Sequence, residues 1–428
     1  MSEYRGYYGR ALDFLKQNNV KVGDTVSITT DSESTATIMP RYEHSDENHI
    51  AVKFKSGYNV GVEISKIRKI QFVSAAEKAA AAQEMQKPEP SLPKILLMST
   101  GGTIASRIDY RTGSVTPALS AQELNASVPE LAEIANIDAE VLFSEYSENI
   151  TPEHWIKTAQ KLDSYANSDY VGIIVAHGTD TMQYTAAFLS FALAGFPKPI
   201  VLVGSQRSSD RPSSDAAQNL IAAARFVAGC NRNGVFVAMH KNQSDGEIAC
   251  HLGTRVRKNH TSRRDAFETV GGEPAFVISN DTITENFTEN YYRQESYSPK
   301  IAVDTSVALV KYHPGYDPGT IDHIVEKGCR AIIFEGTGLG HIGRSMYEAV
   351  QRAQKRQVFL GMTSQCIDGR VNMAVYESGR DLMHIGVVPL GNMLPEVALV
   401  KAMWACASND QGQISDIMLQ NVASEFSE

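Results

Sequence analysis

The sequence predicts an α/β protein in which a body of two domains follows a small β-rich domain. From Lys94 onward, short apolar strands alternate with helical patterns, an order typical of parallel sheets covered by helices on both faces. Before that point, five short runs rich in Val, Ile and Thr are separated by turn residues, which is typical of a small β-barrel. The length of 428 residues agrees with roughly two to four domains.

The small domain is expected over residues 1–73 and resembles SH3-like barrels in size. The pattern predicts an amphipathic helix over Tyr4–Gln17 and five strands in the segments GDTVSITT, STATIMP, HIAVKF, SGYNVGVE and ISKIRKIQFV. Residues 74–93 are rich in Ala, Gln and Glu and end with three prolines. This composition predicts a tether that is helical at first and then extended.

The body is expected to form two α/β domains, over residues 94–285 and 301–428, joined by the polar linker 286–300. In the first domain the predicted strands are KILLMS, AEVLFSEY, YVGIIVAHG, PIVLVGSQ, GVFVAMH and AFVISN. Its predicted helices are SAQELNASVPELAEIA, TPEHWIKTAQKLDSYA, TMQYTAAFLSFALA and SSDAAQNLIAAARFVAG. The second domain repeats the alternation with the strands SVALVKYH, RAIIFEG and QVFLGMTSQ and the helices HIGRSMYEAVQRAQ and LPEVALVKAMWACA.

The composition argues against several classes of protein. Lys and Arg number 40 against 49 Asp and Glu, a net charge of −9, which does not suit a nucleic-acid-binding chain. The five cysteines are scattered without zinc-ligand spacing, so we expect no metal site and reduced thiols in the cytoplasm. The first residues lack the apolar region of a secretory signal, and no run approaches the ~18 apolar residues of a membrane span, so no membrane contact is expected.

The first candidate motif is STGGTIAS (Ser99–Ser106), directly after the strand KILLMS. Two adjacent glycines allow the backbone to approach a ligand closely, and the hydroxyl of Thr103 follows where loop N–H groups can face a developing oxyanion. A strand-to-helix turn that needs glycine only for tight geometry explains the motif equally well. Both interpretations remain open on these residues alone.

The second motif is AHGTDTM (Ala176–Met182), which follows the strand YVGIIV and precedes an apolar helix. In open α/β sheets, ligands bind outside the carboxyl ends of the strands, so Thr179 and Asp180 are candidate site residues. The same pair also suits a helix N-cap with a carboxylate on the helix dipole. His177 is expected to be a structural hydrogen-bonding residue rather than a base.

The third motif is HLGTRVRKNHTSRRDAF (His251–Phe267), which holds five basic residues within ten positions. Such a cluster is usually a solvated surface or balances charge in an acidic protein. Lys258, drawn into a pocket beside Asp180, would instead serve as a proton relay, because burial readily changes the protonation of a lysine. The spacing along the chain does not show whether these residues meet.

Other common catalytic and nucleotide-binding motifs are absent or incomplete. The chain has no GxxxxGK[ST] and no GxSxG, so nothing indicates ATP binding or a serine hydrolase elbow. The segment GTGLGHIG (Gly336–Gly343) has His341 where a dinucleotide fingerprint needs its third glycine.

Together, STGGTIAS, HGTDTM and PIVLVGSQRSSDRPSSDAAQNL resemble the bacterial-type L-asparaginases and glutaminases in order and spacing over residues of about 94–428. The resemblance implies an asparaginase-like body of a larger and a smaller α/β domain. The added N-terminal barrel, the tether and the late segment TSQCIDGRVNMAVYESGRDL resemble the D subunits of archaeal glutamyl-tRNA(Gln) amidotransferases. That second resemblance spans essentially the whole chain.

The resemblance also implies roles for individual residues. Thr103 matches the nucleophile, Thr179 and Asp180 match the HGTDT pair, and Lys258 matches the catalytic lysine. Three further residues match the substrate-binding positions of the family. Ser147 and Glu148 match the segment that holds the α-amino and carboxylate groups of the substrate, and Tyr110 matches a tyrosine on a mobile loop. One loop differs, because GTGLGH stands where asparaginases have GVGNGN, with Leu339 and His341 in place of the asparagines. This difference is compatible with another substrate side chain or another assembly.

The implied function is a glutaminase that supplies ammonia for converting Glu-tRNA(Gln) to Gln-tRNA(Gln). The resemblance implies no cofactor in this chain. It implies a partner, the amidotransferase E subunit, which binds the tRNA and carries ATP and Mg. It also implies a homodimer of this chain within a heterotetramer. Two alternatives remain: a free-standing cytoplasmic L-asparaginase or glutaminase, and a non-catalytic chain whose body is only a scaffold. Retention of all four catalytic positions argues against the scaffold.

Overall fold

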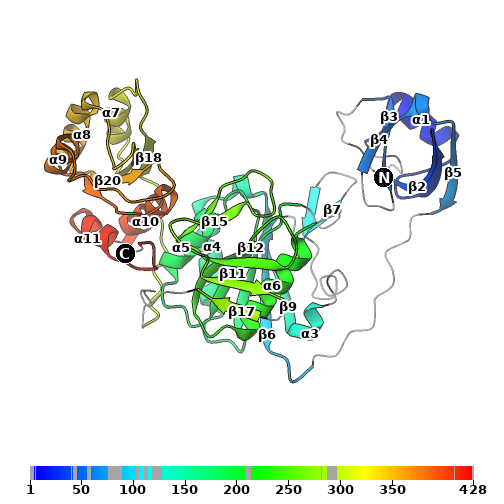
Figure 1. Cartoon of the computed structure of the whole chain (residues 1–428), viewed down its shortest axis with the longest axis horizontal. Coiled ribbons are helices and arrows are strands. Elements are labelled where there is room, and N and C mark those ends of the chain that lie inside the picture. The colour runs from blue at the N-terminus through cyan, green and yellow to red at the C-terminus, as the bar shows by residue number, and fades with distance from the viewer. Residues whose placement is uncertain are drawn as a thin grey trace.

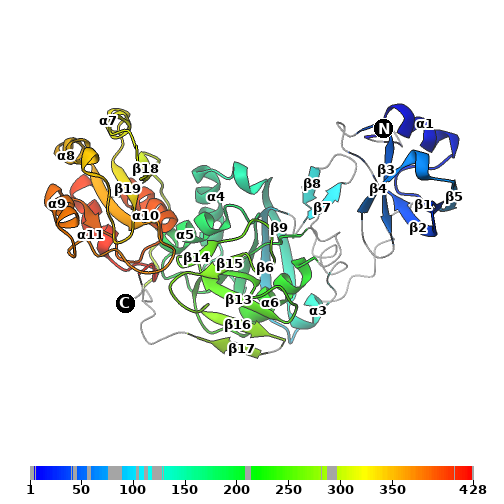
Figure 2. The same ribbon diagram turned by 45° about the horizontal axis from the view of Figure 1, so that its top comes forward.

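The computed structural model describes residues 4, 6–39, 41, 46–54, 59–75, 89–102, 106–109, 114–117, 128, 130–207, 214–280, 282–286, 296–408 and 410–426. In Figures 1 and 2 an N-terminal β domain, a larger α/β domain and a C-terminal α/β domain follow one another across the view. This sequence of domains confirms the predicted fold class. Most of the predicted tether and much of the predicted linker lie outside the described residues.

The N-terminal domain is an antiparallel sheet of five strands in the order β4-β3-β2-β1-β5, with one helix packed against it. Val26 and Ile28 of β1 are buried and alternate with less buried neighbours, as expected for a strand with one face on a core. Among the described residues, the core of this domain consists of its own residues, most of them on the helix and strands, with Tyr7 and Val20 added from the segments that flank α1. The elements are α1 (Gly9–Gln17), β1 (Thr25–Thr29), β2 (Glu33–Ile38), β3 (His49–Phe54), β4 (Asn59–Glu63) and β5 (Lys69–Ser74).

Helix α1 begins at Gly9 rather than at the predicted Tyr4. Gly6 has a φ of +75°, and Tyr8 is extended with φ −143° and ψ 172°, so the helical pattern cannot continue backwards through them. Tyr7 is buried between these two residues, and its hydroxyl donates to the Met39 carbonyl at 2.6 Å. This aromatic residue therefore anchors the approach to the helix instead of belonging to it.

The larger α/β domain is built on a sheet of eight strands in the order β17-β16-β13-β12-β11-β10-β6-β9. The five strands from β12 to β9 are parallel, as predicted. The apolar residues of β6, β10, β11 and β12 are buried almost without a break, whereas those of the edge strand β9 are mostly half-buried. The bounds are β6 (Lys94–Gly101), β9 (Asn136–Glu145), β10 (Gly172–Ala176), β11 (Pro199–Val203) and β12 (Gly234–His240).

The other three strands of this sheet are antiparallel, so the prediction of a parallel sheet is wrong for that part. Strand β12 ends at His240 and the next strand begins at Glu247, a connection too short for the crossover helix that parallel strands need. The prediction also omitted the first and last of the three. Their bounds are β13 (Glu247–Leu252), β16 (Phe276–Ser279) and β17 (Thr282–Glu285).

Helices cover both faces of the eight-stranded sheet. One face packs on α4 and α5, and the other packs on α3 and α6. Only the end of the predicted helix SAQELNASVPELAEIA lies within the described residues, where it forms α3. The bounds of these helices and of two small hairpins are α3 (Leu131–Ile134), α4 (Pro152–Asp163), α5 (Met182–Ala192), α6 (Ala216–Gly229), β7 (Ser106–Asp109), β8 (Ser114–Pro117), β14 (Val256–Lys258) and β15 (Phe267–Thr269).

The C-terminal domain has a parallel sheet in the order β18-β19-β20-β21. One face of this sheet packs on α7, α8 and α9, and α10 covers the other. Three of its strands and α8 and α10 were predicted, whereas β21, α7, α9 and α11 were not. The elements are β18 (Val307–Lys311), α7 (Gly319–Glu326), β19 (Ala331–Gly336), α8 (Tyr347–Lys355), β20 (Phe359–Ser364), α9 (Glu377–Ile385), β21 (Val388–Pro389), α10 (Pro395–Ser408) and α11 (Ile414–Leu419).

Helices α5 and α10 join the two α/β domains through one hydrophobic core. The rings of Phe191 and Trp404 stack between these helices with centroids 5.8 Å apart, and the Trp404 indole N–H donates to the Lys300 carbonyl at 2.9 Å. The end of the predicted linker packs here as well, because the Tyr297 hydroxyl donates to Asp163 at 2.5 Å. Within the described residues, no helix has the length and apolar character needed to cross a membrane.

Candidate active site

Three polar turns meet at the carboxyl ends of the neighbouring parallel strands β9, β6 and β10. They are Gly101–Gly102 at the end of β6, His177–Thr181 after β10, and the 3-10 helix η2 (Ser147–Asn149) after β9. Ligands of open α/β sheets bind at this edge. The topology therefore brings the first two sequence motifs and the Ser147 segment together.

The two glycines of the first motif are required by close backbone approach. Gly101 and Gly102 have φ values of +117° and +79°. A Cβ on Gly101 would lie 2.2 Å from the Glu145 carbonyl oxygen, and one on Gly102 would lie 2.7 Å from the Gly178 amide nitrogen. The turn is therefore packed directly against the loop that carries Thr179. Thr103 itself lies outside the described residues, as does Tyr110.

Lys258 links the second motif to the third. Its Nζ donates to Thr179 Oγ1 at 2.8 Å and to Asp180 Oδ1 at 2.6 Å. The Lys258 side chain is only 10% exposed, whereas that of Asp180 is 64% exposed. An amine that contacts both a hydroxyl and a carboxylate can move a proton to or from that hydroxyl.

The contacts of Asp180 and Thr181 argue against a simple helix cap. Thr181 is the N-cap of α5 but makes no side-chain capping hydrogen bond. Its hydroxyl instead donates to the Ser147 carbonyl at 2.6 Å. The Ser147 hydroxyl lies 3.3 Å from the Asp180 amide nitrogen and 3.4 Å from Asp180 Oδ2. The loop is thus fixed from the turn after β9, and the carboxylate of Asp180 contacts Lys258, the Ser147 hydroxyl and solvent.

Gln183, which was not predicted from the sequence, holds the backbone of Lys258 in place. Gln183 Oε1 accepts a hydrogen bond from the Lys258 amide at 2.7 Å, and this side chain is buried on α5. A glutamine in the first turn of an otherwise apolar helix is the signal that would have identified it, because a polar side chain buried there needs a specific partner. Gln183 therefore fixes the backbone of Lys258 against helix α5.

His177 is a structural residue, as the sequence suggested. Its Nδ1–H donates to the Gly178 carbonyl at 2.7 Å, and its Nε2 accepts from the Thr185 hydroxyl at 2.9 Å. Complete burial lowers the pKa of His177 to about 4. The imidazole is therefore neutral at physiological pH and links the loop to helix α5 through these two hydrogen bonds.

This burial predicts a loss of stability in mild acid. Below its ordinary pKa of 6.5, His177 takes up a proton only in the unfolded chain, and His251, whose pKa burial lowers to about 3, behaves alike. Stability is thus full above pH 6.5 and falls by about 1.4 kcal/mol per pH unit for each histidine as the pH decreases. Urea unfolding at about pH 7.5 and about pH 5.5 measures it. Between these two pH values, the free energy of unfolding of a His177→Gln variant should fall by about 1.4 kcal/mol less than that of the wild type. Equal losses in the two proteins would contradict the assignment.

Most of the basic cluster of the third motif is not a solvated surface, because its members have specific partners; Arg263, which is 42% exposed, is the exception. Arg255 is buried and donates to backbone carbonyls, and Arg257 pairs with Glu396 at 3.1 Å. Arg263 and Arg264 pair with Asp265 and Asp245, respectively. Lys258 is the member that reaches the candidate site.

Two further segments from the sequence analysis stand apart from the lysine. Glu148 is exposed on η2, one position after Ser147. The GTGLGH loop lies in the C-terminal domain, where the Leu339 carbonyl accepts from the Asn372 amide at 3.0 Å. In the same loop, His341 contacts the Ser378 hydroxyl at 3.3 Å. This loop is therefore held both by Asn372, which precedes α9, and by the first turn of α9 itself.

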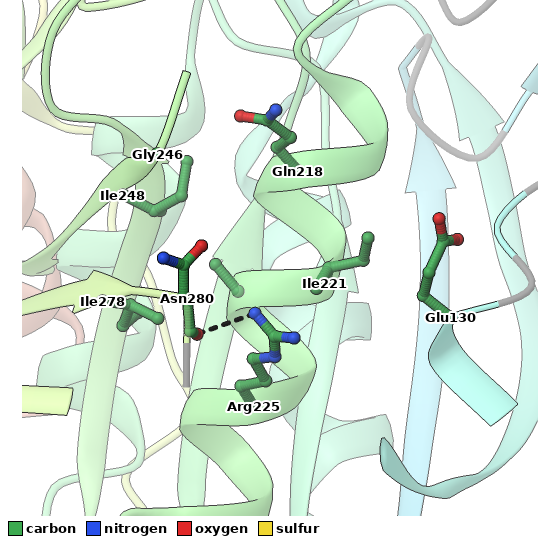
Figure 3. A pocket seen from close by; sticks show the side chains of 9 residues that line it. Glu130, Gln218, Ile221, Arg225, Gly246, Ile248, Ile278 and Asn280 are labelled. Atoms are coloured by element: carbon green, nitrogen blue, oxygen red, sulfur yellow. Dashed lines mark hydrogen bonds between the residues drawn. The ribbon is translucent and has the colours of Figure 1, made fainter. Parts of the chain in front are cut away.

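A shallow depression of about 180 Å³ on the larger domain shares no residue with the Thr179–Lys258 cluster. Figure 3 shows it beside α6, where Arg225 Nη1 donates to the Asn280 carbonyl at 2.7 Å. Nor do the described residues contain a group of three or more His, Cys, Asp or Glu arranged to hold a metal ion. The depression is lined by Glu130, Gln218, Ile221, Ala222, Arg225, Gly246, Ile248, Ile278 and Asn280.

Family models match three parts of the chain. Residues 94–290 match the asparaginase N-terminal domain, and residues 306–418 match the glutaminase/asparaginase C-terminal domain. Residues 20–73 match the GatD N-terminal domain. The body and the small β domain thus have separate family matches.

Comparison with individual proteins covers nearly the whole length. The D subunit of glutamyl-tRNA(Gln) amidotransferase from Sulfolobus acidocaldarius is 45% identical over 424 residues, 98% of this chain and 95% of the relative. The protein of the same name from Pyrococcus furiosus is 45% identical over 430 residues, 97% of each chain. Among solved structures, the thermostable L-asparaginase from Thermococcus kodakarensis matches with a TM-score of 0.70 and 31% identity, over 78% of this chain and 99% of its own.

Proposed function

The chain belongs to the family of glutamyl-tRNA(Gln) amidotransferase D subunits, and from this premise we propose that it hydrolyses glutamine to supply ammonia for converting Glu-tRNA(Gln) to Gln-tRNA(Gln). The observation that carries the chemistry is the contact of Lys258 Nζ with both Thr179 and Asp180. The likeness over the full length, including the N-terminal domain, favours the amidotransferase role.

The proposed reaction begins at Thr103, whose position in the GGT motif matches the family's nucleophile. Its hydroxyl oxygen attacks the carboxamide carbon of glutamine, and N–H groups of the glycine-rich turn stabilise the oxyanion. Lys258, acting as a neutral amine oriented by Asp180, takes the hydroxyl proton through Thr179 and returns it to the leaving nitrogen. Ammonia departs, and water then hydrolyses the threonine ester to release glutamate.

The substrate groups away from the carboxamide are assigned to the turn after β9. We expect Ser147 and Glu148 to hold the α-amino and α-carboxylate groups of glutamine, since both lie on η2 beside the Asp180 loop. Support comes from the Ser147 hydroxyl, which accepts a hydrogen bond from the Asp180 amide at 3.3 Å and so lies beside the catalytic loop. Tyr110 is proposed to close over the substrate on the family resemblance alone.

The relatives are named as subunits, which indicates that this chain works in a complex. We propose that the partner is the amidotransferase E subunit, which binds the Glu-tRNA(Gln), activates its glutamate with ATP and Mg, and uses the ammonia released here. This division of labour agrees with a sequence that contains no GxxxxGK[ST] motif. A homodimer of this chain within a heterotetramer is the assembly we expect.

A free-standing L-asparaginase is the second candidate, because the body matches the Thermococcus kodakarensis L-asparaginase over 99% of that chain. The two candidates share an active site and differ in what activates it. A third, the non-catalytic scaffold, does not explain why Lys258, Thr179 and Asp180 are within hydrogen-bond distance.

Ammonia release from glutamine and from asparagine, by the chain alone and with the E subunit plus Glu-tRNA(Gln), tests this proposal. We expect slow glutamine hydrolysis by the chain alone and a rise of at least about tenfold in the complex, because regulated glutaminases gain activity when their partner closes the site. Rapid asparagine hydrolysis that the partner leaves unchanged would instead support the free-standing asparaginase.

A further inference from the structure

The strand that carries Lys258 does not belong to the main sheet. Strand β14 has three residues and pairs only with β15, in a two-stranded sheet of its own among the described strands. Only three residues separate β14 from β13 of the eight-stranded sheet, and among them the Gly253 amide donates to the Val235 carbonyl at 2.9 Å. Side-chain contacts add to this link, one from Gln183 of α5 and the others from the C-terminal domain.

One set of contacts comes from the C-terminal end of the chain, far away in sequence. The buried Thr254 hydroxyl donates to the Ala423 carbonyl at 2.7 Å. Arg255 Nη1 donates to the carbonyls of Asn392 and Glu425, at 2.9 and 3.1 Å. The two residues that precede β14 are thus tied to the C-terminal segment, which we define as Asn421–Phe426.

A buried ion pair fixes that C-terminal segment. Lys401 of α10 donates to Glu425 Oε1 at 2.5 Å, and both side chains are 0% exposed. The same ammonium donates to the Met418 carbonyl at 3.1 Å and to that of Gln420. The Glu425 carboxylate also accepts from the amides of Val422 and Ala423. All the polar groups of this pair are therefore used to hold one backbone turn.

Such a pair is better suited to selecting one geometry than to adding stability. Desolvation offsets most of the attraction between two buried charges, so an apolar pair of similar size would stabilise the fold as well. What the pair achieves here is to aim two carbonyls, those of Ala423 and Glu425, at Thr254 and Arg255. A second tie from the same domain, Glu396 to Arg257 at 3.1 Å, holds β14 next to the lysine.

We propose that the C-terminal segment, held by the Lys401–Glu425 pair, positions Lys258 for proton transfer through Thr254 and Arg255. Lys258 contacts substrate-side groups, whereas Thr254 and Arg255 are positioning residues that act through β14. The proposal rests on the role of Lys258 in the proposed function. It makes the C-terminal domain part of the catalytic geometry of the larger domain.

The test uses the full chain in complex with the E subunit and compares Thr254→Val with Thr254→Ser. Valine keeps the volume but leaves the Ala423 carbonyl without its donor, whereas serine keeps the hydroxyl. Thr158→Val is the matched control, because Thr158 is equally buried and its hydroxyl donates to a backbone carbonyl at 2.8 Å, within α4. Melting temperature, kcat and KM for glutamine hydrolysis are measured for each protein.

Thr254→Val is expected to lower kcat by about tenfold with KM changed less than about twofold, because a small displacement of a relay group affects the reaction more than binding. Thr254→Ser should recover most of the loss. Thr158→Val should lower the melting temperature by an amount similar to Thr254→Val but should keep the wild-type kcat. Equal kcat values for the two valine variants, or a loss that serine does not restore, would overturn the proposal.

A second variant keeps the test decisive if Thr254→Val does not fold. Glu425→Gln preserves size but places an NH2 group against either the Val422 and Ala423 amides or the Lys401 ammonium. Each orientation opens the turn, so the same selective loss of kcat is expected. An unchanged kcat would overturn the proposal. Failure of the proposed function is recognised separately, because Lys258→Met would then retain activity.

Discussion

Replacing Lys258 with methionine is expected to lower kcat for glutamine hydrolysis by about a thousandfold, within the range that positioned acid–base groups contribute. Methionine retains the apolar stem but removes the Nζ that contacts Thr179 and Asp180. The hydroxyl proton of the nucleophile then has no acceptor, so both formation and breakdown of the acyl-enzyme slow down. A comparable loss is expected for Thr103→Ala. Single-turnover ammonia release separates this chemical defect from weaker substrate binding.

The fold should survive this change. Asp180, the charged partner, is 64% exposed and remains hydrated when the lysine is gone, so the ion pair is worth less than about 1 kcal/mol. Lys241→Met provides the matched control, because Lys241 pairs with Glu247 at 3.4 Å on β13, outside the site. The control should keep full activity. Wild-type turnover by Lys258→Met would remove this residue from the mechanism.

Replacing Gly101 with alanine is expected to reduce the free energy of unfolding by about 2–6 kcal/mol, the sum of backbone strain and overpacking. Gly101 has a φ of +117°, which side chains rarely tolerate, and its new Cβ would meet the Glu145 backbone at 2.2 Å from oxygen and 2.7 Å from nitrogen. Because strand β9 cannot yield without breaking its pairing with β6, the turn before Thr103 must shift. Urea unfolding and glutamine hydrolysis should both show the defect.

Gly246→Ala separates the two causes. Gly246 has nearly the same φ, +113°, but a Cβ there would meet nothing within 4 Å. This variant should therefore show only the strain, about 1–3 kcal/mol, with hydrolysis unchanged. If Gly101→Ala is no worse than Gly246→Ala, the close approach of β6 to β9 does not matter for stability.

The sequence predicted the strands that obey one simple pattern. Apolar runs such as β10 and β11 were found because a strand buried on both faces is apolar throughout. The antiparallel strand β13 was missed because its sequence, EIACHL, mixes polar and apolar residues. The start of α1 was misplaced because the helical period of the residues continues through Gly6 and Tyr8, whose backbone conformations interrupt it.

The candidate site was predicted in its parts but not in its contacts. Lys258 and Thr179 are 79 positions apart, and only the family resemblance indicated that they meet. Local patterns identified Thr179 and Asp180 because they follow a buried strand. Thr254 carried no such signal, because its importance comes from a backbone carbonyl that only the tertiary structure brings near. Gln183 was visible as a glutamine in an apolar helix, but its partner, the Lys258 amide, was not.

The separate cores have a consequence for how such a chain can evolve. The N-terminal domain encloses a core of its own, whereas helices α5 and α10 merge the two α/β domains into one. A module with an independent core can be gained, lost or exchanged by recombination without compensating substitutions in the rest of the protein. The two α/β domains have no such freedom, because a substitution at their shared boundary alters the packing of both, and they must be inherited together.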